Sequence, residues 1–149
     1  MTKTQTKLTN PKDMVGTRKA GISCVPQAVL AELGVAMLEG ACKYGRFNWR
    51  VAGVRASVYL DALNRHIFQQ WWDEGEDIDL DSQLSHITKG ISTLVVMRDA
   101  MIQGMLVDDR PPRSKPFMAE LNQAAGAVID RHTDKSPRHY TIDDTGLKL

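Results

Sequence analysis

Residues 71–86 read WWDEGEDIDLDSQLSH and separate two apolar patterns of helical spacing. Six carboxylates fall within this short stretch: Asp73, Glu74, Glu76, Asp77, Asp79 and Asp81. Like charges at this density repel one another unless something cationic lies among them. Hard divalent ions such as Mg²⁺ and Mn²⁺ prefer oxygen ligands of this kind, and Mg²⁺ is commonly held by carboxylates together with substrate phosphates. The stretch therefore indicates a loop between two helices and favours metal-assisted phosphate chemistry.

Two other interpretations of this acidic loop compete with a metal site. The spacing Asp77-x-Asp79-x-Asp81 is how a calcium-binding loop begins, but such a loop needs glycine at its sixth position and glutamate at its twelfth. Those positions are Ser82 and Thr88, which disfavours a calcium loop. A solvated loop without any ligand is an alternative that composition leaves open, because runs of charge are commonly solvated.

Apolar residues at three- and four-residue steps predict helices on both sides of the acidic loop. The first predicted helix begins near Pro26, where the first turn tolerates proline, and ends at about residue 43. The second covers about 59–72, and the third runs from an N-cap at Asp81 or Ser82 to about residue 105. An irregular connection over 43–57 joins the first two, and a shorter helix is expected over about 117–129.

These patterns predict an all-α fold, an antiparallel helical bundle of about four helices that is oligomeric. The second and third helices should lie antiparallel across the acidic loop, with the first beside them. The expected organisation is an N-terminal arm over 1–24, an all-α domain over 25–130 and a C-terminal tail over 131–149.

Composition excludes several classes of function. The 149 residues carry 19 basic and 18 acidic side chains, and this net charge of +1 gives no overall field that would attract nucleic acid or an anionic membrane. Cys24 and Cys42 lack the spacing of metal ligands and are expected to stay reduced. No apolar run approaches the roughly 18 residues that span a bilayer, and no signal peptide is recognisable. We expect a cytoplasmic protein.

Several charged side chains of the predicted helices are candidates for a site. Glu39 precedes Lys43 by one turn, so the two are either a surface ion pair or part of a phosphate site. Asp61 and Arg65 have the same spacing, and Arg65 would suit phosphate oxygens through its planar fork of donors. His66 falls on the apolar stripe, where a hydrogen-bonded core histidine is the simpler interpretation.

Histidines and aromatic residues supply two further hypotheses. A histidine–aspartate metal set of His66, His86 and Asp99 is disfavoured, because thirteen residues of unbroken helix separate His86 from Asp99 by about 20 Å. Rings of tyrosine or tryptophan in the connection could stack on a purine, and an asparagine could contact its hydrogen-bonding edge. The candidates are Tyr44, Asn48 and Trp49, with core packing as the alternative for Trp49.

The chain resembles the phage dATP/dGTP diphosphohydrolases of the MazZ family, which are related to the all-α MazG-type nucleotide pyrophosphohydrolases. The resemblance covers about residues 10–110, and its blocks are NPKD at 10–13, EGACKYGRFNWR at 39–50, SVYLDALNRH at 57–66, WWDEGEDIDLDS at 71–82 and SH at 85–86. Two positions depart from the family pattern: Gln83 replaces a glycine, and Lys89 stands where a second histidine is often found.

This resemblance implies hydrolysis of dGTP and dATP to the monophosphate and pyrophosphate, which supplies dGMP for 2-aminoadenine nucleotide synthesis in a phage. It implies two or more Mg²⁺ or Mn²⁺ ions, with ligands that we predict to be Glu39, Asp61, Glu76, Asp77 and Asp79, and Asp99 as a further candidate. By the same resemblance, phosphate charge is countered by Lys43 and Arg65, and His66 or His86 orients water or phosphate. The expected partners are a purine deoxynucleoside triphosphate and further copies of the chain, as a dimer or tetramer in the host cytoplasm.

Two alternatives stay open from the sequence. One is a histidine–aspartate triphosphohydrolase, which would release triphosphate and a nucleoside. The other is a non-catalytic phage binding protein whose acidic loop holds a metal ion or a basic partner.

Overall fold

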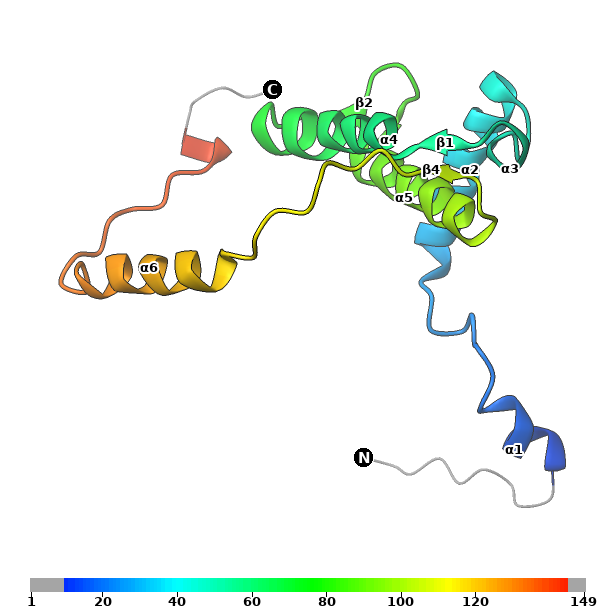
Figure 1. Ribbon diagram of the computed structural model, residues 1–149, viewed down its shortest axis with the longest axis horizontal. Helices are drawn as coiled ribbons and strands as arrows, with labels where there is room; N and C mark the ends of the chain where they lie inside the picture. The colour runs from blue at the N-terminus through cyan, green and yellow to red at the C-terminus, as the bar shows by residue number, and fades with distance from the viewer. Residues whose placement is uncertain (1–9, 145–149) are drawn as a thin grey trace.

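The structure is a computed structural model that describes residues 10–144. It is predominantly helical, which confirms the predicted all-α class (Figure 1). Its elements in chain order are α1 (Pro11–Gly16), α2 (Gln27–Tyr44), α3 (Trp49–Ala52), β1 (Val54–Arg55), α4 (Ala56–Leu63), η1 (Asn64–Asp73), β2 (Ile78–Asp79), β3 (Leu84–Ser85), α5 (His86–Ile102), β4 (Leu106–Val107), α6 (Met118–Asp130) and η2 (Ile142–Asp144).

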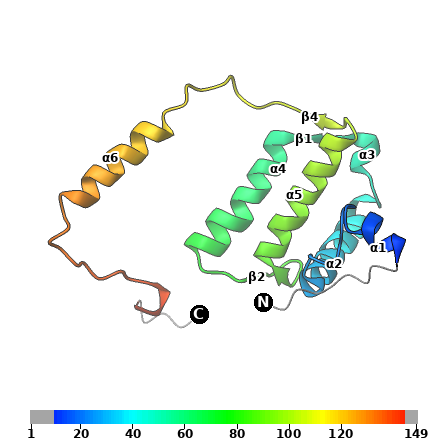
Figure 2. The same ribbon diagram turned by 90° about the horizontal axis from the view of Figure 1, so that it is seen from below.

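Helix α5 lies between α2 and the continuous segment formed by α4 and η1, and we call these three segments the helical body (Figure 2). The α5 helix packs against each of the other two segments. It runs antiparallel to α4 and η1, as the sequence predicts for helices joined across the acidic loop. Helix α2 and the combined span of α4 and η1 agree with the predicted first and second helices to within a few residues.

The start of α5 differs from the prediction. The prediction of an N-cap at Asp81 or Ser82 was wrong, because Ser85 is the cap and its Oγ accepts a hydrogen bond from the Ile87 N–H at 3.2 Å. The residues before it form a small antiparallel pair, β2 with β3, in which Ile78 is opposite Ser85. The helix also ends at Ile102, slightly earlier than expected.

The second helix of the body changes its winding part of the way along. Residues Asn64–Asp73 form a π-helix, in which each N–H bonds to the carbonyl five residues earlier, and it follows directly from α4. At its end the Glu74 N–H donates to the Gln69 carbonyl at 2.9 Å. Such winding is rare and is frequent at functional sites. The helical periodicity alone does not distinguish this winding from an α-helix.

The predicted irregular connection contains the short helix α3 and a strand that ties it to the end of α5. Strand β1 pairs in parallel with β4, with Val54 opposite Leu106. Gly53 permits this contact, because its φ is +74° and an added Cβ would lie 2.9 Å from the Met105 carbonyl oxygen. Trp49, Val54 and Ala100 form the buried core there.

Two helices stand apart from the body. Figure 1 shows α1 and α6 at the ends of extended segments, away from α2, α4 and α5. A bundle that includes a fourth helix therefore stays a prediction. Residues 1–9 of the expected arm and 145–149 of the expected tail lie outside the described residues. Within the described part of the chain, no helix is long and apolar enough to cross a membrane.

Candidate functional site

A carboxylate with two lysine partners joins α2 to α5 and to the acidic loop. Glu39 Oε1 lies 2.6 Å from Lys43 Nζ, and its Oε2 lies 2.5 Å from Lys89 Nζ. Lys43 Nζ also donates to Asp81 Oδ2 at 2.9 Å. Burial alone would raise the pKa of Glu39, but the hydrogen bonds from Lys43 and Lys89 outweigh it and leave that pKa below its usual value. Hydrogen bonds to Glu39 and Asp81 raise the pKa of Lys43.

Lys89 was not among the residues predicted for the site. The Lys89 side chain is mostly buried and pairs with Glu39, so its ammonium group is held in one position. A signal was present in the sequence, because Lys89 lies three residues after His86, and residues at that spacing share a helix face. The face of α5 that carries the histidine therefore also presents an ammonium group to α2.

Two histidines, from η1 and from the first turn of α5, face each other. His66 Nδ1 and His86 Nδ1 are 2.9 Å apart, a distance at which one ring must donate and the other accept. His86 is completely buried, and its Nε2 has no hydrogen-bond partner among the described residues. The nearest carboxylate oxygen, Glu76 Oε2, lies 3.6 Å from that nitrogen. A buried imidazole with this unsatisfied atom is costly, which is typical of a functional position.

The surroundings of His66 favour its neutral form. Burial lowers the pKa of His66, and the neighbouring His86 lowers it further, against a smaller opposing effect of Asp79. Burial would raise the pKa of Asp79, but hydrogen bonds from the Ser82 hydroxyl and from backbone N–H groups bring it below its usual value. Ser82 Oγ donates to Asp79 Oδ2 at 2.5 Å. The loop thus keeps an ionised carboxylate near a neutral histidine.

A glycine brings the two histidines together. Gly90 is buried one turn after His86 on α5. A Cβ added to it would lie 2.6 Å from Ile67 Cδ1 and 3.4 Å from Leu63 Cδ1. The lack of a side chain there lets α5 approach η1 closely, and His66 is adjacent to Ile67 in the sequence.

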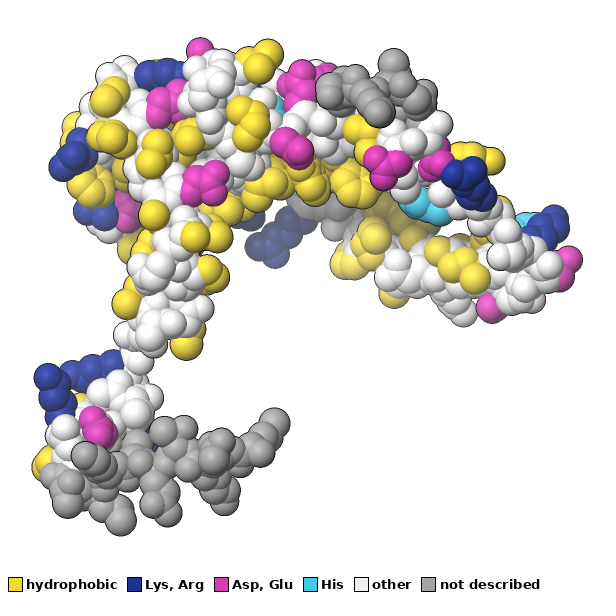
Figure 3. Space-filling model, turned by 180° about the vertical axis from the view of Figure 1, so that it is seen from behind, with side chains coloured by type: hydrophobic (Ala, Val, Ile, Leu, Met, Phe, Trp, Pro, Cys, Tyr) yellow, Lys and Arg dark blue, Asp and Glu magenta, His cyan; other side chains and the backbone are white. Residues whose placement is uncertain are grey.

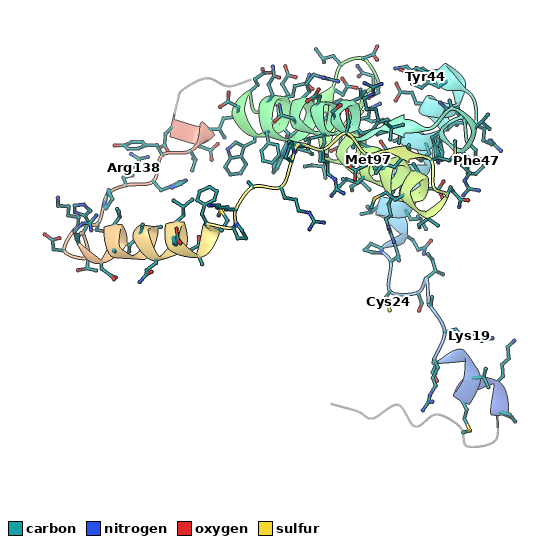
Figure 4. All side chains as sticks on the ribbon, viewed as in Figure 1. Lys19, Cys24, Tyr44, Phe47, Met97 and Arg138 are labelled. Atoms are coloured by element: carbon teal, nitrogen blue, oxygen red, sulfur yellow. The ribbon has the colours of Figure 1, made fainter. Side chains whose placement is uncertain are left out.

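A pocket opens next to the Glu39 cluster, between α2, α4, η1 and α5. Its lining includes Gly40, Tyr44, Asn48, Trp49, Tyr59 and Arg65. The three predicted base-contact residues and Arg65 therefore lie around one cavity, and Tyr44 lies at the end of α2 (Figure 4). Gly40 follows Glu39 directly, so the pocket adjoins the charged cluster. Aromatic and apolar walls with a few polar groups are typical of small-molecule sites.

Trp49 also has a structural role. It is buried in the core, and its indole N–H donates to Asp99 Oδ2 at 2.6 Å. Arg50 forms two further bonds to the same carboxylate, each 2.8 Å long. Hydrogen bonds from Arg50 first and Trp49 second lower the pKa of Asp99 to about 2. Asp99 thus lies near the far end of α5 from His86, and a single chain does not assemble the histidine–aspartate set.

The five predicted metal ligands do not converge in the described structure. Over residues 10–144, no three side chains of His, Cys, Asp or Glu come close enough to hold one ion. Glu39 is held by lysines, and Asp61 and Asp77 are exposed. The donor chemistry fits Mg²⁺ or Mn²⁺, since the acidic loop supplies carboxylate oxygens. Coordination by Glu39 would require Lys43 or Lys89 to move.

The helical body thus carries an aromatic pocket beside a charged cluster, and these features are typical of a site for a small molecule. The model of the family described as dATP/dGTP diphosphohydrolase, N-terminal, matches residues 9–110, well over half of the chain. The chain belongs to this family and is therefore an enzyme of the pyrophosphohydrolase type. Comparison with curated proteins gives no match, and comparison with solved structures gives none either.

Proposed function

We propose that the chain hydrolyses dGTP and dATP to the monophosphate and pyrophosphate, and that in a phage the dGMP supplies 2-aminoadenine nucleotide synthesis. Family membership supports the activity. The observation that carries the proposal is the contiguity of an aromatic pocket with a lysine-rich charged cluster, joined at Glu39 and Gly40. A purine deoxynucleoside triphosphate has one aromatic end and one polyanionic end, and these two adjoining surfaces match that division.

The base and sugar would occupy the pocket. Tyr44 supplies a ring for stacking, and Asn48 supplies an amide that can both donate to and accept from a purine edge. The triphosphate would then extend toward Lys43 and Lys89, while Arg65 on the pocket wall contacts phosphate oxygens through its guanidinium. Positive side chains arranged beforehand around developing negative charge lower the barrier for phosphoryl transfer.

The histidine pair would control one proton. If His86 Nδ1 donates to His66, then His66 carries its own proton on Nε2 and can donate to a phosphate oxygen. If His66 is the donor, its Nε2 is free to accept a proton from the attacking water. The burial of His86 holds this pair in one orientation.

Two or more Mg²⁺ or Mn²⁺ ions, held by carboxylates drawn from Glu39, Asp61, Glu76, Asp77 and Asp79, would supply charge neutralisation of the triphosphate. We also propose a homo-oligomer, a dimer or tetramer in the host cytoplasm. The large apolar side chains that α2 and α5 leave exposed support this, among them Val35, Leu38, Leu94 and Met101.

Identification of the products tests the proposal. The purified chain is incubated with dGTP or dATP, with and without Mn²⁺ or Mg²⁺, and the products are separated by chromatography. Metal-dependent dGMP or dAMP together with pyrophosphate is expected. Release of triphosphate would contradict the proposed bond cleavage, and no turnover with any metal would leave only a binding role.

A pair of arginine variants refines that test. Arg65→Gln removes a guanidinium from the pocket wall, and Arg110→Gln removes one that pairs with Asp108 in the segment after β4. We expect turnover to fall strongly in the first variant and to be unchanged in the second.

Glu76→Gln keeps the size of an acidic-loop side chain but removes its charge, and loss of turnover in a normally folded variant is the expected result.

A further inference from the structure

Phe47 occupies a backbone conformation that bulky side chains rarely adopt. Its φ is +58°, in the left-handed region. It is the third residue of the turn over residues 45–48, which the Asn48 N–H closes by donating to the Gly45 carbonyl at 3.3 Å. Glycine or asparagine is usual at the third position of a turn with positive φ there. A phenylalanine in this place is strained, and such strain persists only where the surrounding contacts enforce it.

The contacts that enforce this conformation are made by the phenylalanine ring. Its centroid lies 5.4 Å from the ring centroid of Trp49, with the two planes tilted by 55°. The guanidinium carbon of Arg50 lies 4.8 Å from the Phe47 centroid, within the range of a cation–π contact. Both partners are fixed in turn, since Trp49 and Arg50 each donate to the carboxylate of Asp99 on α5. The turn is therefore clamped to the helical body through one aromatic ring.

Phe47 lies on the other side of Trp49 from the pocket proposed for the base. It lines a second, largely apolar pocket against α2, and Trp49 belongs to both linings. Figure 4 shows Phe47 and Tyr44 at the same end of the body, and Figure 3 shows basic side chains among hydrophobic ones at that end. The Phe47 ring can therefore act on a bound base only through its neighbours in the chain.

The next residue, Asn48, does line the base pocket. It precedes α3 at the N-cap position, where asparagine commonly caps a helix with its side chain, but here the side chain makes no capping bond. The Asn48 backbone is nevertheless held, because its carbonyl accepts from the N–H groups of Val51 and Ala52 at 3.1 and 2.9 Å. The half-buried amide lines the pocket instead of serving the helix. Its direction is set by the turn that Phe47 clamps.

We propose that Phe47 is a positioning residue for base recognition, whose clamped ring fixes the turn so that the Asn48 amide meets a purine edge in the pocket. The inference rests on the proposed function, because it takes the base to occupy this pocket. An amide whose direction is fixed beforehand loses little freedom on binding, so its donor and acceptor discriminate between bases. A pyrimidine, whose single ring is shorter, would leave the amide unpaired, and a site built around a hydrogen bond rejects such a ligand.

Binding of non-hydrolysable nucleotides tests the inference without turnover. The probes are the α,β-imido analogues of dGTP and dCTP with Mn²⁺, measured on the full chain by isothermal titration calorimetry. Asn48→Ala and Phe47→Ala should each raise Kd for the purine analogue about tenfold, as for the loss of a hydrogen bond in a pocket, and change Kd for the pyrimidine analogue little. Val51→Ala shortens an 86% exposed side chain of α3 and is the matched control, expected to change neither Kd.

A double-mutant cycle identifies the route by which Phe47 acts. If the ring works through Asn48, then Phe47→Ala adds nothing to Asn48→Ala, and the double variant binds the purine analogue as weakly as Asn48→Ala alone. Additive losses would show that the ring supports the pocket by a separate route. Either additive losses or an equal loss for both analogues would overturn the proposal.

Phe47→Gly separates the ring from the backbone strain. Glycine adopts a φ of +58° freely, so this variant should unfold at no lower temperature than Phe47→Ala, yet it should lose the purine preference because the ring is absent. Phe47→Tyr keeps the ring and should keep the preference. A retained preference in Phe47→Gly would overturn the proposal.

The binding readout also separates this inference from the proposed activity. A chain that binds the purine analogue more tightly but releases triphosphate from dGTP would contradict only the proposed bond cleavage. A wild-type chain that binds neither analogue, or binds both equally, would overturn the role of Phe47 in base recognition.

Discussion

Helix α5 of the helical body and helix α6 are both amphipathic, but among the described residues only α5 packs against several other helices. In the body, α5 contacts α2, α4 and η1, and its first turn holds a completely buried histidine. Helix α6 leaves its large apolar side chains exposed, among them Met118, Leu121, Val128 and Ile129. The difference teaches that apolar spacing specifies a helix, whereas a site arises only where several helices constrain the same polar groups. Matched substitutions in the two regions test this.

Histidines give the largest expected contrast. His86→Leu removes the buried partner of His66, and we expect turnover to fall by about 100-fold or more, as for the loss of a general acid or base. His139→Leu changes an exposed histidine of the tail and should leave turnover unchanged. Steady-state kinetics with dGTP measures both. A His86→Leu enzyme that keeps full activity and a normal fold would remove the pair from the mechanism.

Two glycine substitutions, one in α5 and one in α6, are expected to give the next largest difference, in the free energy of unfolding. Gly90→Ala forces a Cβ against Ile67 and should destabilise the chain by about 1–3 kcal/mol, the usual cost of overpacking. Gly126→Ala in α6 meets nothing within 4 Å and should stabilise that helix by up to about 1 kcal/mol. Urea unfolding followed by circular dichroism compares them. Equal effects of the two alanines would mean that α5 and η1 are not closely packed.

Lysines give a smaller contrast. Lys89→Met removes an ammonium from the charged cluster, and we expect KM for dGTP to rise about tenfold, equivalent to about 1.4 kcal/mol. Lys135→Met changes an exposed lysine beyond α6 and should not alter KM at saturating metal. A rise in KM for both variants would instead indicate a general effect of net charge.

Two carboxyls with similar pKa values give the smallest contrast. The pKa of Asp99 and that of Asp108 are each lowered to about 2 by an arginine, but Arg50 is distant in sequence from Asp99, whereas Arg110 is two residues from Asp108. The depressed pKa of Asp99 gives stability that is present above about pH 4 and is lost as pH falls toward 2.

Asp99→Asn should therefore flatten the acid limb of stability between pH 4 and 2. Asp108→Asn should change it less, because so local a pair can persist in the unfolded chain. Thermal unfolding at pH 2, 3 and 4 measures the difference. The same slope in the wild type and in Asp99→Asn would show that Asp99 does not titrate with folding.

Long apolar patterns made the main helices predictable. The first helix was expected to end near residue 43, and α2 ends at Tyr44. The prediction was accurate because an eighteen-residue helix repeats its apolar spacing over several turns. The predicted start of α5 was too early, because Asp81, Ser82 and Ser85 all suit an N-cap. In the structure, β3 pairs with β2 and extends to Ser85, so the helix begins only after that residue. The π-winding of η1 was not predictable, because apolar periodicity alone does not identify it.

The sequence supplied candidate residues for a site, but it did not show which of them contact one another. Tyr44, Asn48, Trp49 and Arg65 were predicted from type and position, and they line one pocket. Lys89 and the pairing of His66 with His86 depend on how α5 meets α2 and η1, which one sequence does not reveal. The predicted metal ligands stay a prediction, because over residues 10–144 no three such side chains come close enough to hold one ion.

The parallel pair of β1 with β4 has a consequence for the order of folding. Val54 pairs with Leu106 only after a loop of about fifty residues has closed, whereas α4, η1 and α5 can meet as a local hairpin. Contacts between distant residues form slowly because the chain must first lose the entropy of that closure. We expect the histidine pair to assemble early and the aromatic wall of the pocket last. The two histidines would therefore meet before the aromatic wall of the pocket is complete, because that wall requires residue 107 to have been synthesised and docked.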